Sequence, residues 1–128
     1  MIRNWLVLGC REEFSQTIYI AHGILGSAQN WRSFALKWSS KRPETRFVLF
    51  DIRNHGRSGP GSDPNTVNAC ARDLVKLSQE VGPPDILVGH SFGGKVVLAY
   101  LDFCKVTPDQ VWLLDSAVGK LDISDGKI

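Results

Sequence analysis

The hydrophobic positions of this chain fall into short continuous runs separated by segments with helical spacing. Each run is nearly unbroken in Ile, Val, Leu, Phe or Tyr, which is typical of parallel strands covered on both faces. Four strands are therefore predicted, at residues 17–21, 46–51, 85–89 and 111–115. An earlier apolar run at residues 5–8 is far too short to span a membrane, and charged residues follow it at once.

The segments between the runs predict three helices. The second helix is expected over residues 66–81, and the third begins after Ser91 and ends before Pro108. The first is marked by a stripe that we expect to pack on the sheet, made of Trp31, Phe34, Ala35 and Trp38. The order β-α-β-α-β-α-β predicts an α/β fold with an open, doubly wound, mainly parallel sheet, whose ligands sit at the carboxyl ends of the strands.

Length and composition indicate one ordinary globular domain over residues 1–128, with its motifs between residues 17 and 119. The 128 residues are 43% hydrophobic and 22% charged, and the net charge of +2 is scattered along the chain. We therefore expect neither a nucleic acid nor a membrane as partner. Three cysteines, an odd number without metal-ligand spacing, favour no metal site and a reducing intracellular compartment, cytoplasmic or organellar.

The sequence Gly89-His90-Ser91-Phe92-Gly93 follows a predicted strand and opens a predicted helix. This is the context of a nucleophile elbow, a sharp turn that holds its serine in a strained conformation and lifts the hydroxyl clear of the sheet. Glycines two positions on either side allow the neighbouring elements to approach closely. The pattern predicts Ser91 as a nucleophile, and the start of the next helix would favour negative charge beside it.

An acyl-transfer site also needs N–H donors for the oxyanion of the tetrahedral intermediate. One donor is expected from the residue after the nucleophile, Phe92, and the other from a loop after an earlier strand. The loop that begins His22-Gly23 is in that position, and the backbone N–H of Ile24 is our choice within it.

Taken together, four motifs in this order resemble those of the alpha/beta-hydrolase superfamily, specifically its small bacterial and organellar esterases. They are His22-Gly23, Asp51-Ile52-Arg53-Asn54-His55-Gly56-Arg57-Ser58, Gly89-His90-Ser91-Phe92-Gly93-Gly94-Lys95 and Leu114-Asp115. The resemblance implies a partial alpha/beta-hydrolase fold, a Ser-acid-His triad in that chain order, and hydrolysis of a small-molecule acyl ester or thioester without a cofactor. It also implies that residues 51–58 form a structural turn beside the site, with no catalytic role for His55.

The acid and the base are less completely specified than the nucleophile. Asp115 ends the strand after the serine strand and is the candidate acid, but it could equally cap a turn, because many relatives take the acid from a later strand. All three histidines, His22, His55 and His90, precede the serine or adjoin it, so none matches the family base. We therefore interpret the chain as the nucleophile half of a hydrolase, with residues 120–128 as a truncated end and at most residual activity alone.

Two alternatives remain open at this stage. Residues 89–95 also satisfy the nucleotide-loop pattern G-x-x-x-x-G-K, although Val96 stands where that loop needs Ser or Thr for magnesium. The chain could also be a binding or regulatory fragment that does no chemistry. In either case a sheet of four strands would leave apolar edges exposed, which predicts self-association.

Overall fold

The computed structural model describes residues 1–10 and 12–116, and in this part of the chain five strands form one sheet. Their order is β1-β3-β2-β4-β5, with β1 antiparallel to β3 and all other neighbours parallel. The strands are β1 (Trp5–Gly9), β2 (Gln16–Ala21), β3 (Thr45–Phe50), β4 (Ile86–His90) and β5 (Gln110–Leu114). The predicted fold class, a doubly wound and mainly parallel α/β sheet, is confirmed.

Strand β1 was not among the predicted strands. The other four match their predicted runs to within one residue at each end, whereas the apolar run at residues 5–8 forms an edge strand. β1 pairs from Trp5 opposite Phe50 to Gly9 opposite Arg46, and its apolar side chains are half-buried. Because a half-buried antiparallel edge strand lacks the crossover helix that marks a parallel one, the alternation of strands and helices does not reveal it.

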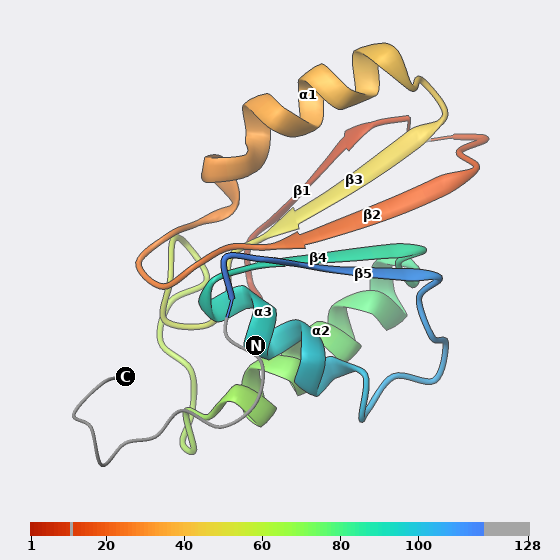
Figure 1. Cartoon of the computed structure of the whole chain (residues 1–128). Coiled ribbons are helices and arrows are strands. Elements are labelled where there is room, and N and C mark those ends of the chain that lie inside the picture. The colour runs from red at the N-terminus through yellow and green to blue at the C-terminus, as the bar shows by residue number, and fades with distance from the viewer. Residues whose placement is uncertain (11, 117–128) are drawn as a thin grey trace.

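Helices cover both faces of the sheet (Figure 1). Helix α1 (Arg32–Lys41), preceded by the short 3-10 helix η1 (Ala28–Trp31), lies on one face, and α2 (Val67–Val81) and α3 (Phe92–Tyr100) lie on the other. Helix α2 is capped at its start by Thr66, whose side chain accepts the N–H of Ala69 at 3.1 Å, and at its end by Gly82, before the two prolines that predict its end. None of the helices described is long and apolar enough to cross a membrane.

The hydrophobic core is divided by the sheet into two clusters. The larger lies between the sheet and helices α2 and α3, and its most deeply buried members include Tyr19, Val48, Leu74, Val96 and Tyr100. The smaller lies beneath η1 and α1 and is built from Ile18, Ile20, Ala28, Ala35, Phe47 and Leu49. Burial on both faces explains why β2 and β3 have nearly continuous apolar sequences.

The aromatic stripe of α1 is only partly covered. Ala35 is fully buried, but Phe34 is 46% exposed and Trp38 is 39% exposed. Both rings meet Phe47 edge-on, at centroid distances of 6.2 and 6.3 Å. The expectation that this stripe packs on the sheet therefore holds for its β3 side only, since α1 lies over β1 and β3 rather than over β4 and β5.

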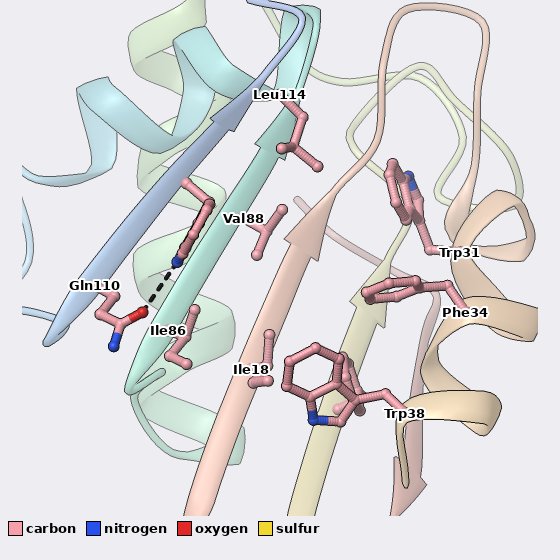
Figure 2. Close-up of a pocket in the computed structure, with 10 residues that line it drawn as sticks. Ile18, Trp31, Phe34, Trp38, Ile86, Val88, Gln110 and Leu114 are labelled. Atoms are coloured by element: carbon pink, nitrogen blue, oxygen red, sulfur yellow. Dashed lines mark hydrogen bonds between the residues drawn. The ribbon is translucent and has the colours of Figure 1, made fainter. Parts of the chain in front are cut away.

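An apolar groove of about 360 Å³ lies between α1 and the uncovered part of the sheet (Figure 2). Trp31, Phe34 and Trp38 form one wall, and side chains of β2, β4 and β5 form the floor. The floor residues are Ile18, Ile86, Val88, Gln110, Trp112 and Leu114, and Phe47 completes the lining.

Candidate active site

Ser91 stands at the sharp turn between β4 and α3, at the carboxyl edge of the sheet. Its backbone angles are φ +53° and ψ −117°, a conformation that costs a non-glycine residue about 1–3 kcal/mol. Its N–H donates to the carbonyl of Leu114 at 3.0 Å, and its own carbonyl accepts the N–H of Gly94 at 3.0 Å. The strained elbow expected from the sequence is therefore present, and α3 begins at the next residue.

The two glycines of the elbow are required by close packing. A Cβ at Gly89 would lie 2.6 Å from the carbonyl oxygen of Gly93, and a Cβ at Gly93 would overlap the carbonyl oxygen of Ala21. Real Cβ atoms essentially never come within 3.0 Å of another heavy atom in this way. Strand β2, which ends at Ala21, can therefore approach the elbow only because these side chains are absent.

The same geometry disfavours the nucleotide-loop alternative. The side chain that would have to hold magnesium belongs to Val96, which is fully buried in the larger core cluster and carries no oxygen. Among the described residues, no group of three or more His, Cys, Asp or Glu side chains could hold a metal ion.

The loop after β2 lies directly against the elbow serine. A Cβ built on Gly23 would be 3.3 Å from the Cβ of Ser91, and the next residues form a turn closed by the Gly26 N–H on the Gly23 carbonyl at 3.0 Å. Within the described part of the chain, the N–H groups of Ile24 and Phe92 have no hydrogen-bond partner. Their assignment as oxyanion donors stays a prediction.

His22 anchors this loop and has no nitrogen left for proton transfer. Its ring is fully buried, Nε2 accepts the N–H of Ile52 at 3.0 Å, and Nδ1 lies 2.7 Å from the carbonyl oxygen of Gly23, to which its N–H donates. Burial lowers the pKa of His22, which favours the neutral ring that this pair of contacts requires. His22 is therefore a structural anchor.

Asp51 ties three separate segments together at the end of β3. Its buried carboxylate accepts the N–H of Ala28 at 2.7 Å, the N–H of Arg57 at 2.8 Å and the side-chain amide of Asn4 at 2.8 Å. Burial alone would raise the pKa of Asp51, but these donors outweigh it and hold the pKa below its usual value. The charged carboxylate is thus part of the scaffold under the site.

The segment after β3 forms a turn beside the elbow, in the place expected for a structural motif. The ring of His55 stacks on Phe92 at a centroid distance of 6.3 Å and lies 5.1 Å from the ring of His22. Its Nδ1 is 2.9 Å from the carbonyl of Arg53, whose guanidinium forms a buried ion pair with Asp73 at 2.7 Å. The contacts are those of a packed turn, and the absence of a catalytic role for His55 stays a prediction.

His90 lines a second hollow. Its ring meets Trp31 edge-on at 5.6 Å, and the hollow of about 310 Å³ is lined by Gly23, Ile24, Gly26, Asn30, Trp31 and His90. All three histidines of the sequence lie in the described part of the chain, and none of them hydrogen-bonds Ser91. The expectation that none of the three is the catalytic base stays a prediction.

Asp115 lies immediately after β5, whose Leu114 is the register partner of His90. The candidate acid and the candidate nucleophile thus follow neighbouring strands at the same sheet edge. Asp115 is exposed and has a φ of +49°. The predicted truncated end at residues 120–128, which contains the further carboxylates Asp122 and Asp125, lies outside the described residues.

One neighbour of Ser91 was missed by sequence reasoning. The hydroxyl of Ser116 donates to the carbonyl of Ser91 at 2.8 Å. One feature of the sequence could have indicated a close neighbour at this point, namely the second glycine of the Gly93-Gly94 pair. A Cβ at Gly94 would overlap the Ser116 hydroxyl.

The fold and the elbow define an α/β protein with a strained serine at the carboxyl edge of a mainly parallel sheet. A family model described as alpha/beta hydrolase fold matches residues 16–111. The chain therefore belongs to the alpha/beta hydrolase family.

Relatives with assigned names agree with this membership. The chain is 40% identical over 82 residues to the sn-1-specific diacylglycerol lipase ABHD11 of Mus musculus, which covers 63% of this chain and 26% of that protein. It is 36% identical over 101 residues to the lipase LipV of Mycobacterium tuberculosis, covering 76% of this chain and 36% of that protein. The solved structure of a marine microorganism esterase superposes with a TM-score of 0.79 and 28% identity, covering 94% of this chain and 44% of that chain. The chain thus spans between a quarter and a half of the length of these relatives.

Proposed function

We propose that this chain supplies the nucleophile side of a serine hydrolase that cleaves carboxylic esters or thioesters. The observation that carries the proposal is the conformation of Ser91, which has a φ of +53° directly before α3 and beside the Gly23 loop. A non-glycine residue is held in such a conformation only where the surrounding structure enforces it, and enforced strain of this kind concentrates at functional sites.

In the proposed reaction, Ser91 Oγ attacks the acyl carbonyl of the substrate and gives up its proton to a general base. The oxyanion of the tetrahedral intermediate accepts hydrogen bonds from the N–H groups of Ile24 and Phe92 and lies near the positive end of the α3 dipole. The alcohol or thiol then leaves with a proton, and water hydrolyses the acyl-enzyme by the same route.

The proposal places the acid of the triad within these 128 residues and the base outside them. Asp115 is the candidate acid because it follows the strand next to the serine strand. The contacts of His22, His55 and His90 give no support to any of them as the base, so we assign that role to a histidine outside these 128 residues.

The proposed substrate is a small-molecule acyl ester or thioester. Support comes from the three relatives described above, which are a diacylglycerol lipase, a lipase and an esterase. The free thiols of Cys10, Cys70 and Cys104 support the further proposal of a reducing intracellular compartment, cytoplasmic or organellar. We also propose that the 128-residue chain associates with itself through the exposed edges of its sheet.

The first experiment tests the nucleophile by covalent labelling. The 128-residue chain is incubated with a fluorophosphonate and its modified peptides are mapped by mass spectrometry, with Ser91→Ala as the control. We expect slow modification confined to Ser91, because the elbow exposes the hydroxyl but no base activates it. Labelling at other serines, or equal labelling of the Ser91→Ala chain, would contradict the proposal and favour a binding or regulatory fragment.

Turnover of p-nitrophenyl esters tests the assignment of the base. We expect Ser91→Ala to change the low activity of the 128-residue chain little, and to abolish activity in a longer form that contains a histidine after Ser91. If the 128-residue chain instead turns over at about 1–1000 per second and Ser91→Ala removes that activity, the base lies among His22, His55 and His90.

A further inference from the structure

We propose that Ser116 is a positioning residue that holds Ser91 in its strained conformation. The role rests on the proposed function, since it matters to chemistry only if Ser91 is the nucleophile. Ser116 lies 25 residues after Ser91, outside the elbow motif and beyond the last residue of β5. Its hydroxyl is half-buried and donates to the carbonyl oxygen of Ser91 at 2.8 Å.

The segment 114–116 holds both backbone polar groups of Ser91. The carbonyl of Leu114 accepts the Ser91 N–H at 3.0 Å, and the Ser116 hydroxyl reaches the Ser91 carbonyl at 2.8 Å. The β4–β5 ladder ends at His90 and Leu114, so these two bonds extend the attachment of β5 past the ladder and onto the elbow. A strained backbone with a positive φ persists only where contacts such as these hold it in place.

The backbone of Asp115 allows this arrangement. Its φ of +49° lies in the left-handed region, so the chain turns sharply between Leu114 and Ser116. Both neighbours of Asp115 are thereby bonded to Ser91. The candidate acid is consequently held on the same short segment that holds the candidate nucleophile.

Gly94 provides the space that Ser116 occupies. A Cβ at Gly94 would overlap the Ser116 hydroxyl and lie 2.6 Å from the Ser116 Cβ, whereas Gly89 and Gly93 are required by the elbow and β2. The N–H of Gly94 also donates to the Ser91 carbonyl at 3.0 Å. The second glycine of the pair therefore has a separate purpose, which is to admit the side chain that binds the Ser91 carbonyl.

The test compares Ser116→Ala and Ser116→Thr with a matched serine elsewhere. Ser40 is the control, because its hydroxyl also donates to a backbone carbonyl, that of Lys37 at 2.7 Å, at an exposed position near the end of α1. Hydrogen exchange of the Ser91 backbone amide is followed by NMR on the isotope-labelled chain, before any reaction with fluorophosphonate. Thermal melting and the rate of fluorophosphonate labelling at Ser91 are measured on the same samples.

We expect Ser116→Ala to speed exchange of the Ser91 amide by roughly two- to tenfold, the range for one hydrogen bond. Labelling at Ser91 should slow by a similar factor, and Ser116→Thr, which keeps the hydroxyl, should restore both rates. Ser40→Ala should leave both unchanged. Gly94→Ala, which displaces Ser116, should reproduce the effect of Ser116→Ala.

Unchanged Ser91 exchange in Ser116→Ala, or the same acceleration in Ser40→Ala, would overturn the positioning role. The two proposals can fail separately. If the unmodified chain shows no labelling at Ser91, the nucleophile assignment fails, while the exchange rate of the Ser91 amide still decides whether Ser116 holds the elbow.

Discussion

At the scale of single residues, the histidines of this chain show how motif membership and chemical role can separate. His22 belongs to the motif that opens the loop after β2, yet both of its nitrogens are hydrogen-bonded to the backbone of Gly23 and Ile52. Through these two hydrogen bonds, the ring links the loop after β2 to the residue that follows β3 by two positions. A neutral buried ring of this kind makes folding sensitive to pH.

We predict that the free energy of unfolding falls as the pH drops below the ordinary histidine pKa of 6.5. Burial lowers the pKa of His22 in the folded protein, so the unfolded chain takes up this proton first. The stability is complete above pH 6.5 and is lost toward the lower pKa of the folded state, by up to about 1.4 kcal/mol per pH unit. Urea unfolding between pH 8 and 5 measures the slope, and His22→Gln should make it shallower. An identical slope in that variant would rule out His22 as the source.

Sequence patterns identified some residues of the site much better than others. The elbow at Ser91 and its two glycines could be predicted, because a strand, a turn and a helix in immediate succession leave few geometries. Ser116 could not be predicted from its neighbours, since its contact with Ser91 depends on the pairing of β4 with β5 and on the left-handed turn at Asp115. Contacts between distant segments do not appear in local spacing.

At the scale of elements, the capping of α2 is specified by a single side chain. The hydroxyl of Thr66 accepts the N–H of Ala69, and no acidic residue lies in the first turn to support it. Helix α2 also forms much of the cover of the larger core cluster. Loss of this cap should therefore lower the free energy of unfolding of the whole domain.

We predict that Thr66→Ala lowers the free energy of unfolding by about 1 kcal/mol, the usual contribution of an N-cap. Urea titration at pH 7.5 measures the difference, and Thr66→Ser, which keeps the hydroxyl, should stay close to the original chain. Equal losses in the two variants would mean that the methyl group of Thr66, and not its hydroxyl, supports the helix.

The elements with the clearest apolar patterns are the most deeply buried ones. Strands β2 and β3 have long apolar runs because helices cover each face, and α2 has a clear apolar stripe because one side packs on the core. Strand β1 is a half-buried edge, and α1 leaves two of its aromatic side chains partly in solvent. Where burial is incomplete, the pattern of apolar positions does not state which side is covered or by what.

At the scale of the whole molecule, β5 and the apolar groove lie together at one side of the sheet. Strand β5 is the last strand in the order of the described sheet, and it carries no charged residue. Trp112 at its centre is 55% exposed and donates to the side chain of Gln110 at 3.0 Å (Figure 2). Uncharged edges of this kind pair readily with other strands.

We predict that the 128-residue chain associates in a concentration-dependent manner and that Trp112→Lys weakens this association, because a charged residue on an edge strand disfavours pairing with another strand. Sedimentation velocity over a series of concentrations measures the effect. Val106→Lys is the matched control, since Val106 is also 55% exposed but precedes the strand. A sharp monomer peak with a cooperative melt for the unmodified chain would contradict the prediction.

The carboxylate of Asp51 has a consequence for anyone who redesigns this molecule. Its three donors come from the N-terminal segment, from the start of η1 and from the turn after β3. Loop grafting treats each loop as a replaceable module, yet a graft at residues 22–31 that fails to present an N–H where Ala28 does would leave a buried charge short of a partner. Such a graft would disturb the turn at residues 52–58 as well, so these loops can be exchanged only as a set.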